Sequence, residues 1–188
     1  NVVQKWHTLT LSFNGPYTAE MDAYNPFLHY LLMVEFQNNE TKKVVRGFYA
    51  ADGNAAETSS DSGSVWQVRF TPDLTGEWTY SANLYKGDSI AIGGDYEKAE
   101  KLRIKGNQGV FKVVPSDKKG ADFRARGRIV AQNGWFKFQD TDHYFLKSGA
   151  DSPENFLAYV DFDHTYRIET MNKDGEAETN TEIHSFEP

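Results

Sequence analysis

Aromatic side chains are the groups in this sequence best suited to hold a ligand. They make up 14% of the 188 residues, and each large ring can bury much area or stack on a partner. Trp66 and Trp78 alternate with polar neighbours on strand-like runs, so we assign both to the core. The rings that flank loops are the better platforms for a sugar ring: Tyr17, Tyr24 and Tyr49. Trp135, which follows a tight turn, is a further candidate, with packing at a domain junction as its alternative.

Two carboxylates, Asp151 and Glu154, are the acidic groups best placed for hydrolytic chemistry, with Asn155 beside them. Cleavage of a glycosidic bond usually needs two carboxyl groups roughly 5–10 Å apart. In an intact enzyme, these three residues are candidates to contact a sugar hydroxyl. The alternative is structural, because Ser152 followed by Pro153 is typical of a helix start. We expect no catalysis by this chain alone and assign no catalytic residue.

Other chemistries have little support in the sequence. There is no cysteine, and the five histidines lack the spacing of a zinc site. Calcium remains a weak candidate through scattered oxygen ligands, namely Asp52, Asn54, Asp61, Asp161 and Asp163; we expect no cofactor. A net charge of −7 argues against nucleic acid, and no apolar run approaches the ~20 residues that span a bilayer.

Strand-like alternation dominates the first 115 residues, and we expect no helix there. One face of each run is apolar, as between Leu9 and Phe13, Leu28 and Phe36, Trp66 and Phe70, and Trp78 and Leu84. We expect turns at Asn14-Gly15-Pro16 and Asn25-Pro26, a strand over Lys42–Ala50, and a hairpin joining Leu102–Ile104 to Val110–Val114. About seven strands at this spacing predict an all-β, immunoglobulin-like antiparallel sandwich.

The pattern changes after residue 115. We expect a linker over 116–122, then short strands at Arg128–Ala131, Trp135–Phe138 and Tyr144–Lys147, with a tight turn at Asn133-Gly134. Residues 123–188 are predicted to form a β-meander, a helix that buries Phe156 and Leu157, and the start of a truncated domain. The polar, acidic end beyond Asp163 is predicted to be a disordered tail.

Several motifs resemble one known family. They are Trp6–Phe13 with Gly15-Pro16, Asn25-Pro26-Phe27, Gly47-Phe48-Tyr49, Trp66 to Pro72 with Val68-Arg69-Phe70, and Gly76 with Trp78 and Tyr80. The family is the DUF5060 β-sandwich at the N-terminus of predicted bacterial glycoside hydrolases, typical of Bacteroidetes. The run Tyr144–Phe156 is similar to the first strand and loop of the (β/α)8 barrel that comes after this sandwich in the family.

The resemblance implies a non-catalytic accessory module of a secreted glycoside hydrolase. It implies that the module packs against the barrel of the same chain, helps it to bind a polysaccharide or oligosaccharide, and is periplasmic, cell-surface or extracellular. Two alternatives remain open: an autonomous carbohydrate-binding module, and a structural or adhesive envelope domain. On the accessory reading, Trp135, Phe136, Phe156 and Leu157 should form a partly exposed apolar patch that the barrel covers.

Overall fold

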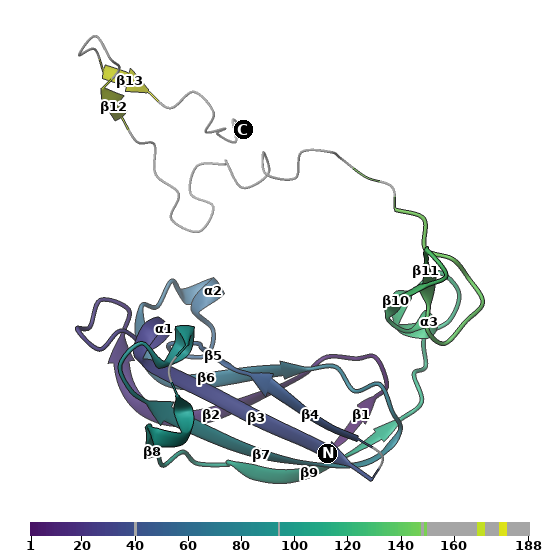
Figure 1. Ribbon diagram of the computed structural model, residues 1–188, viewed down its shortest axis with the longest axis horizontal. Helices are drawn as coiled ribbons and strands as arrows, with labels where there is room; N and C mark the ends of the chain where they lie inside the picture. The colour runs from purple at the N-terminus through teal and green to yellow at the C-terminus, as the bar shows by residue number, and fades with distance from the viewer. Residues whose placement is uncertain (40, 94, 148, 150–168, 172–176, 180–188) are drawn as a thin grey trace. The chain divides into compact units, whose positions relative to one another are not determined.

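The computed structural model describes residues 1–39, 41–93, 95–147, 149, 169–171 and 177–179 (Figure 1). The chain divides into two units, Asn1–Phe145 and Leu146–Pro188. In the second unit, β12 (Glu169–Met171) pairs antiparallel with β13 (Ala177–Thr179). The predicted helix after Ser152, with Phe156 and Leu157, lies outside the described residues. The domain boundary near residue 115 stays a prediction.

Two facing sheets form most of the first unit. One has the order β1 (Val2–Gln4), β9 (Gln108–Val114), β7 (Gly76–Lys86), β3 (Tyr30–Asn38) and β4 (Thr41–Arg46), and β8 (Glu100–Leu102) also pairs with β7. The other has the order β2 (Leu9–Ala19), β6 (Ser62–Phe70) and β5 (Phe48–Tyr49). This division of strands is that of an immunoglobulin-like sandwich, which confirms the predicted fold class.

Alternate residues of the central strands fill the space between the sheets. Trp66 and Trp78 are 2% and 0% exposed, which confirms their assignment to the core. Phe36 of β3 stacks on Phe70 of β6 across the two sheets, with ring centroids 4.0 Å apart. Trp78 also fixes the corner before β7, because its indole Nε1 donates a hydrogen bond of 3.1 Å to the carbonyl oxygen of Leu74.

The chain crosses from one sheet to the other at Gly47. β4 pairs with β3, whereas β5, one residue later, pairs with β6. A side chain at Gly47 would collide with Leu32 and with the carbonyl oxygen of Gln67, so the crossing needs a residue without one. The single strand predicted over Lys42–Ala50 is therefore two strands in different sheets.

Three other predictions were wrong in detail. Asn14-Gly15-Pro16 lies inside β2, at a register irregularity between Asn14 and Thr18, instead of forming a turn. The predicted hairpin near Gly106 does not form, since β8 and β9 both pair with β7, along successive parts of one edge. Short helices also interrupt the strands before residue 115: α1 (Pro26–His29), α2 (Ala55–Thr58), and the 3₁₀ turns η1 (Ile90–Ile92) and η2 (Tyr96–Lys98).

A small hairpin comes after the sandwich within the first unit. It contains α3 (Phe123–Arg126), β10 (Ile129–Gln132) and β11 (Trp135–Phe138). Asn133 and Gly134 both adopt positive φ, 51° and 81°, as the predicted two-residue turn requires. Phe138 is buried against Phe123 and Phe145, with ring centroids 5.5 and 5.8 Å away. Among the described residues, no helix has the length and apolar character to cross a bilayer.

Candidate functional site

The loop before β3 is built around a capped single-turn helix. Asn25 is the N-cap of α1, and its side chain accepts a hydrogen bond of 2.8 Å from the backbone N–H of Phe27. Pro26 occupies the first helical position, where its missing N–H costs nothing. This cap fixes the backbone that carries Tyr24 and Phe27. Figure 1 shows α1, α2 and β5 grouped at one end of the sandwich.

Tyr24 and Phe27 are exposed but firmly held. Tyr24 is 53% exposed, with the His29 ring 5.0 Å away and the Lys86 ammonium 4.8 Å from its centroid. Phe27 is 54% exposed and meets Tyr49 edge to face at 6.0 Å. Aromatic side chains that are fixed before binding lose little freedom on contact with a ligand. Both rings therefore offer preorganised apolar surface.

Tyr49 is a buried core residue, which corrects its prediction as an exposed platform. It is 7% exposed and packs against Trp66, with ring centroids 5.2 Å apart. Its hydroxyl donates to the carbonyl oxygens of Thr18 and Gly63. Burial raises the pKa of Tyr49 to about 12, because the phenolate would be poorly solvated there. Sequence reasoning missed this because β5 is too short to show an alternation.

A cavity of about 180 Å³ opens beside Tyr49, and we call it the aromatic pocket. Its walls include Phe27, Tyr30, Phe48, Tyr49 and Trp66, and Arg46 is its charged residue. The Arg46 guanidinium donates one hydrogen bond of 3.0 Å to the carbonyl oxygen of Ala91. None of Arg46, Phe27 and Phe48 was predicted from the sequence as a site residue; Phe27 and Phe48 stood only in the family motifs Asn25-Pro26-Phe27 and Gly47-Phe48-Tyr49.

The remaining predicted platforms lie outside this pocket. Tyr17 is 73% exposed on the irregular part of β2, and Trp135 is 64% exposed at the start of β11. Asp151, Glu154 and Asn155 lie outside the described residues. Of the predicted platforms, Tyr49 therefore lines the aromatic pocket and Tyr24 lies beside α1, whereas Tyr17 and Trp135 lie outside the pocket.

A second hollow, of about 420 Å³, lies on the outer face of the larger sheet. Pairing places Glu35, Ser81 and Gln108 in one row across three strands, and Gln37, Thr79 and Val110 in the next. We call this surface the polar groove. Its amide, hydroxyl and carboxylate groups can hydrogen-bond a polar ligand, but a solvated sheet face has the same composition. Sequence reasoning treated these positions only as the wet side of their strands.

The hairpin carries a second group of exposed rings, Trp135, Phe136 and Tyr144, which we call the hairpin surface. They are 64%, 56% and 61% exposed. Trp135 meets Tyr144 edge to face, with ring centroids 6.5 Å apart. The expected exposure of Trp135 and Phe136 is therefore observed, whereas Phe156 and Leu157 lie outside the described residues.

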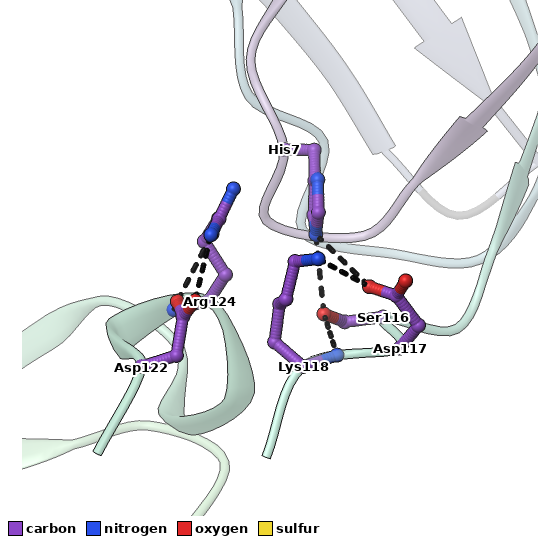
Figure 2. A network of polar contacts seen from close by, with 6 residues as sticks. All are labelled: His7, Ser116, Asp117, Lys118, Asp122 and Arg124. Carbon is purple, nitrogen blue, oxygen red and sulfur yellow. Dashed lines mark hydrogen bonds and ion pairs between the residues drawn. The ribbon is translucent and has the colours of Figure 1, made fainter. Parts of the chain in front are cut away.

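Polar contacts join the hairpin and the linker to the sandwich. Asp140 accepts a hydrogen bond from the Trp6 indole and lies 2.7 Å from the Lys5 ammonium. Figure 2 shows the linker contacts, in which His7 Nε2 lies 3.3 Å from Ser116 Oγ and 3.9 Å from an Asp117 carboxylate oxygen. These partly buried pairs position the hairpin and the linker and resemble no hydrolytic acid–base pair.

Two acidic residues near these sites have structural partners. Asp122 caps α3 and accepts hydrogen bonds from Arg124, which hold the pKa of its carboxyl well below the usual range. Thr58 and the backbone N–H of Asn54 donate to Asp52 and lower its pKa as well. Within the part of the chain that the structure describes, no three His, Cys, Asp or Glu residues form a metal cluster.

Comparisons with known proteins bear on the sandwich and on the length of its relatives. Residues 2–85 match the family model described as a domain of unknown function, DUF5060. A crystal structure of a putative glycoside hydrolase from Bacteroides vulgatus is similar, with 20% identity and a TM-score of 0.53. The match covers 95% of this chain and 35% of that chain, so this chain spans about a third of that relative's length.

No curated protein matches the sequence. At 20% identity the Bacteroides vulgatus structure supports the fold and carries no site residues across. The strand order of an immunoglobulin-like sandwich and the match over residues 2–85 agree, and both confirm the resemblance inferred from the sequence motifs. Residues 2–85 of this chain are thus similar to the DUF5060 domain, and the strands of the sandwich begin within that stretch.

Proposed function

We propose that this chain is the non-catalytic, N-terminal accessory module of a secreted glycoside hydrolase, and that its hairpin surface packs against the catalytic barrel of the same polypeptide. The observation that carries the proposal is the exposure of Trp135, Phe136 and Tyr144. Trp135 and Tyr144 lie on one face of the hairpin and Phe136 lies on the other, because consecutive residues of a strand point to opposite faces. Together the three rings leave roughly 350 Å² open to water, and exposed aromatic rings on both faces of a small element favour burial by a partner.

The length of the similar protein indicates which partner covers the hairpin surface. The Bacteroides vulgatus chain continues well beyond the matched third, and its name is that of a glycoside hydrolase. A partner in the same chain needs only part of the roughly 800 Å² per side of a free complex, because the covalent link supplies a high effective concentration. Asp151, Glu154 and Asn155 stay proposed sugar contacts at the barrel entrance.

The test compares this 188-residue chain with the longer polypeptide that the proposal requires. Serine at Trp135 and Phe136 should lower the melting temperature of the longer polypeptide and leave that of the shorter chain unchanged. Serine at Tyr17, which is 73% exposed outside the hairpin surface, serves as the matched control. Equal effects of the hairpin and control variants in the longer polypeptide would refute the docking.

An autonomous carbohydrate-binding module is the second candidate function. The aromatic pocket and the exposed rings of Tyr17 and Tyr24 favour it. Retention of the 188-residue chain on an immobilised glycan, lost in a Tyr24→Ala variant, would support it. Complete absence of binding across a glycan array would count against it.

A structural or adhesive envelope domain has less support from the sheet edges. The edge strand β4 carries Lys42, Lys43 and Arg46, and charged edges oppose pairing with another chain. On the accessory proposal the module is periplasmic, cell-surface or extracellular, together with its enzyme. Fractionation of expressing cells would test that location.

A further inference from the structure

Three cationic side chains lie in or beside the walls of the aromatic pocket, although the chain as a whole has a net charge of −7. Arg46 lines the cavity directly. The Arg69 guanidinium lies 5.2 Å from the ring centroid of Phe48, and the Lys86 ammonium lies 5.7 Å from that of Tyr30. Two of the pocket walls therefore carry a cation beside their ring. An acidic chain that gathers positive charge at one aromatic cavity favours an anionic ligand there.

Two of the carboxylates in the neighbouring loops have partners of their own. Asp88 lies 3.6 Å from Nδ1 of His29. Asp22 accepts hydrogen bonds from the Thr18 hydroxyl and the backbone N–H of Ala19. In the part of the chain that the structure describes, Arg46 makes no ion pair within 4.0 Å, and it donates one of its five N–H groups to Ala91. The other N–H groups of the planar guanidinium can donate to a ligand carboxylate, and such a pair favours bidentate geometry.

The walls and size of the cavity limit the rest of the ligand. Aromatic rings stack well on the apolar C–H face of a pyranose ring, as platforms do in sugar-binding proteins. A volume of about 180 Å³ holds one such ring and no extended chain. The pocket also lies among the ends of strands and α1, so a polymer would enter by its terminus.

We propose that the aromatic pocket binds a single sugar residue that carries a carboxylate, a hexuronate, at the end of a glycan chain. Phe27 and Phe48 pack against the sugar ring, and Arg46 binds its carboxylate. This inference rests on the proposed function, from which it takes the glycan as partner, and it names the class of sugar. The module would then hold acidic chain ends near the catalytic barrel.

The test is an NMR titration of the ¹⁵N-labelled, 188-residue chain with glucuronate. The chain has four tryptophans and hence four indole N–H signals. Trp66 lines the pocket, and its Nε1 has no hydrogen-bond partner among the described residues. Its signal should move in a saturable way at millimolar ligand. Trp78 is the internal control, because its Nε1 is bonded to Leu74 within the core.

Variants and matched ligands separate the possible outcomes. Arg46→Gln should weaken binding roughly tenfold, since a charge-assisted pair is lost, whereas Arg103→Gln removes an exposed charge elsewhere and should leave it unchanged. Glucose and acetate test the ring and the carboxylate separately. The proposal is overturned if glucose binds as well as glucuronate, if acetate gives the same shift, or if Arg46→Gln has no effect.

Failure here is distinguishable from failure of the accessory role. A chain that ignores glucuronate can still bury its hairpin surface against a barrel, which the variants at Trp135 and Phe136 measure independently. If neutral oligosaccharides move signals of Gln108 and Ser81 instead, the polar groove is the glycan site and the pocket proposal is wrong.

Discussion

Replacing Gly47 by alanine should destabilise the sandwich strongly, because the chain changes sheets at this residue. An added Cβ would lie 2.3 Å from Cδ2 of Leu32 and 2.6 Å from the carbonyl oxygen of Gln67. Leu32 is 1% exposed and cannot swing into solvent, and the Gln67 oxygen belongs to β6, between two pairing strands. Overpacking a core lowers the free energy of unfolding by about 1–3 kcal/mol. Because one of the clashing atoms is a backbone oxygen that cannot move aside, Gly47→Ala should cost near the upper value.

Urea unfolding and thermal melting measure this effect directly. A loss of about 3 kcal/mol should lower the melting temperature by roughly 6–12 °C for a chain of this size. Gly87→Ala is the matched control, because the nearest atoms to its added Cβ are 3.6 Å away. That variant should be unchanged or more stable by up to about 1 kcal/mol. If Gly47→Ala unfolds at the same urea concentration as the wild type, the close packing described for the change of sheet at Gly47 is wrong.

Three further predictions concern single groups. Lys43→Ala should cost about 3 kcal/mol and more than Asp73→Asn, because it leaves the buried Asp73 carboxylate without its cation; urea unfolding would show the order, and a reversed order would contradict it. Because the pKa of Tyr49 is raised, its contribution to stability is complete below pH 10 and is lost as the pH rises through about 12. Tyr49→Phe should therefore lose less stability than the wild type between these two pH values, and an unchanged pH profile would exclude this cause. Serine at Trp135 and Phe136 should change the stability of the 188-residue chain by less than about 0.5 kcal/mol while reducing its binding of an apolar dye, since both rings are exposed; an unchanged dye signal would mean that the dye binds elsewhere.

The sandwich could be predicted because its central strands alternate cleanly. Residues on one side of β3, β6 and β7 are buried, as their hydrophobic period indicates. The two-residue turn at Asn133-Gly134 could also be predicted, since few residue pairs accept positive φ at both positions.

The errors came from local signals that tertiary pairing overrode. Gly15 and Pro16 indicate a turn, yet they lie within β2 at an irregularity of its pairing with β6, where a missing N–H is tolerated. The glycines between Ile104 and Val110 suggested a hairpin. β7 is 11 residues long, however, and one of its edges accommodates both β8 and β9.

The candidate site was harder to predict because burial, and not residue type, decides which rings are available. Tyr49 and Tyr24 both flank loops in the sequence, but one is in the core and the other is half exposed. Arg46 stands in an alternating strand and gave no sign of a site. Its place in the wall of the aromatic pocket depends on how β4, β5 and η1 meet around one cavity, which no local pattern indicates.

The measurement that tests the accessory role most directly is hydroxyl-radical footprinting of the hairpin surface. Trp135, Phe136 and Tyr144 should be labelled readily in the 188-residue chain, as their exposure requires. In the longer polypeptide with its barrel, labelling of these three residues should fall at least severalfold, while that of Tyr17 stays unchanged. Equal labelling of the hairpin surface in both proteins would show that the barrel does not cover it and would contradict the proposed function.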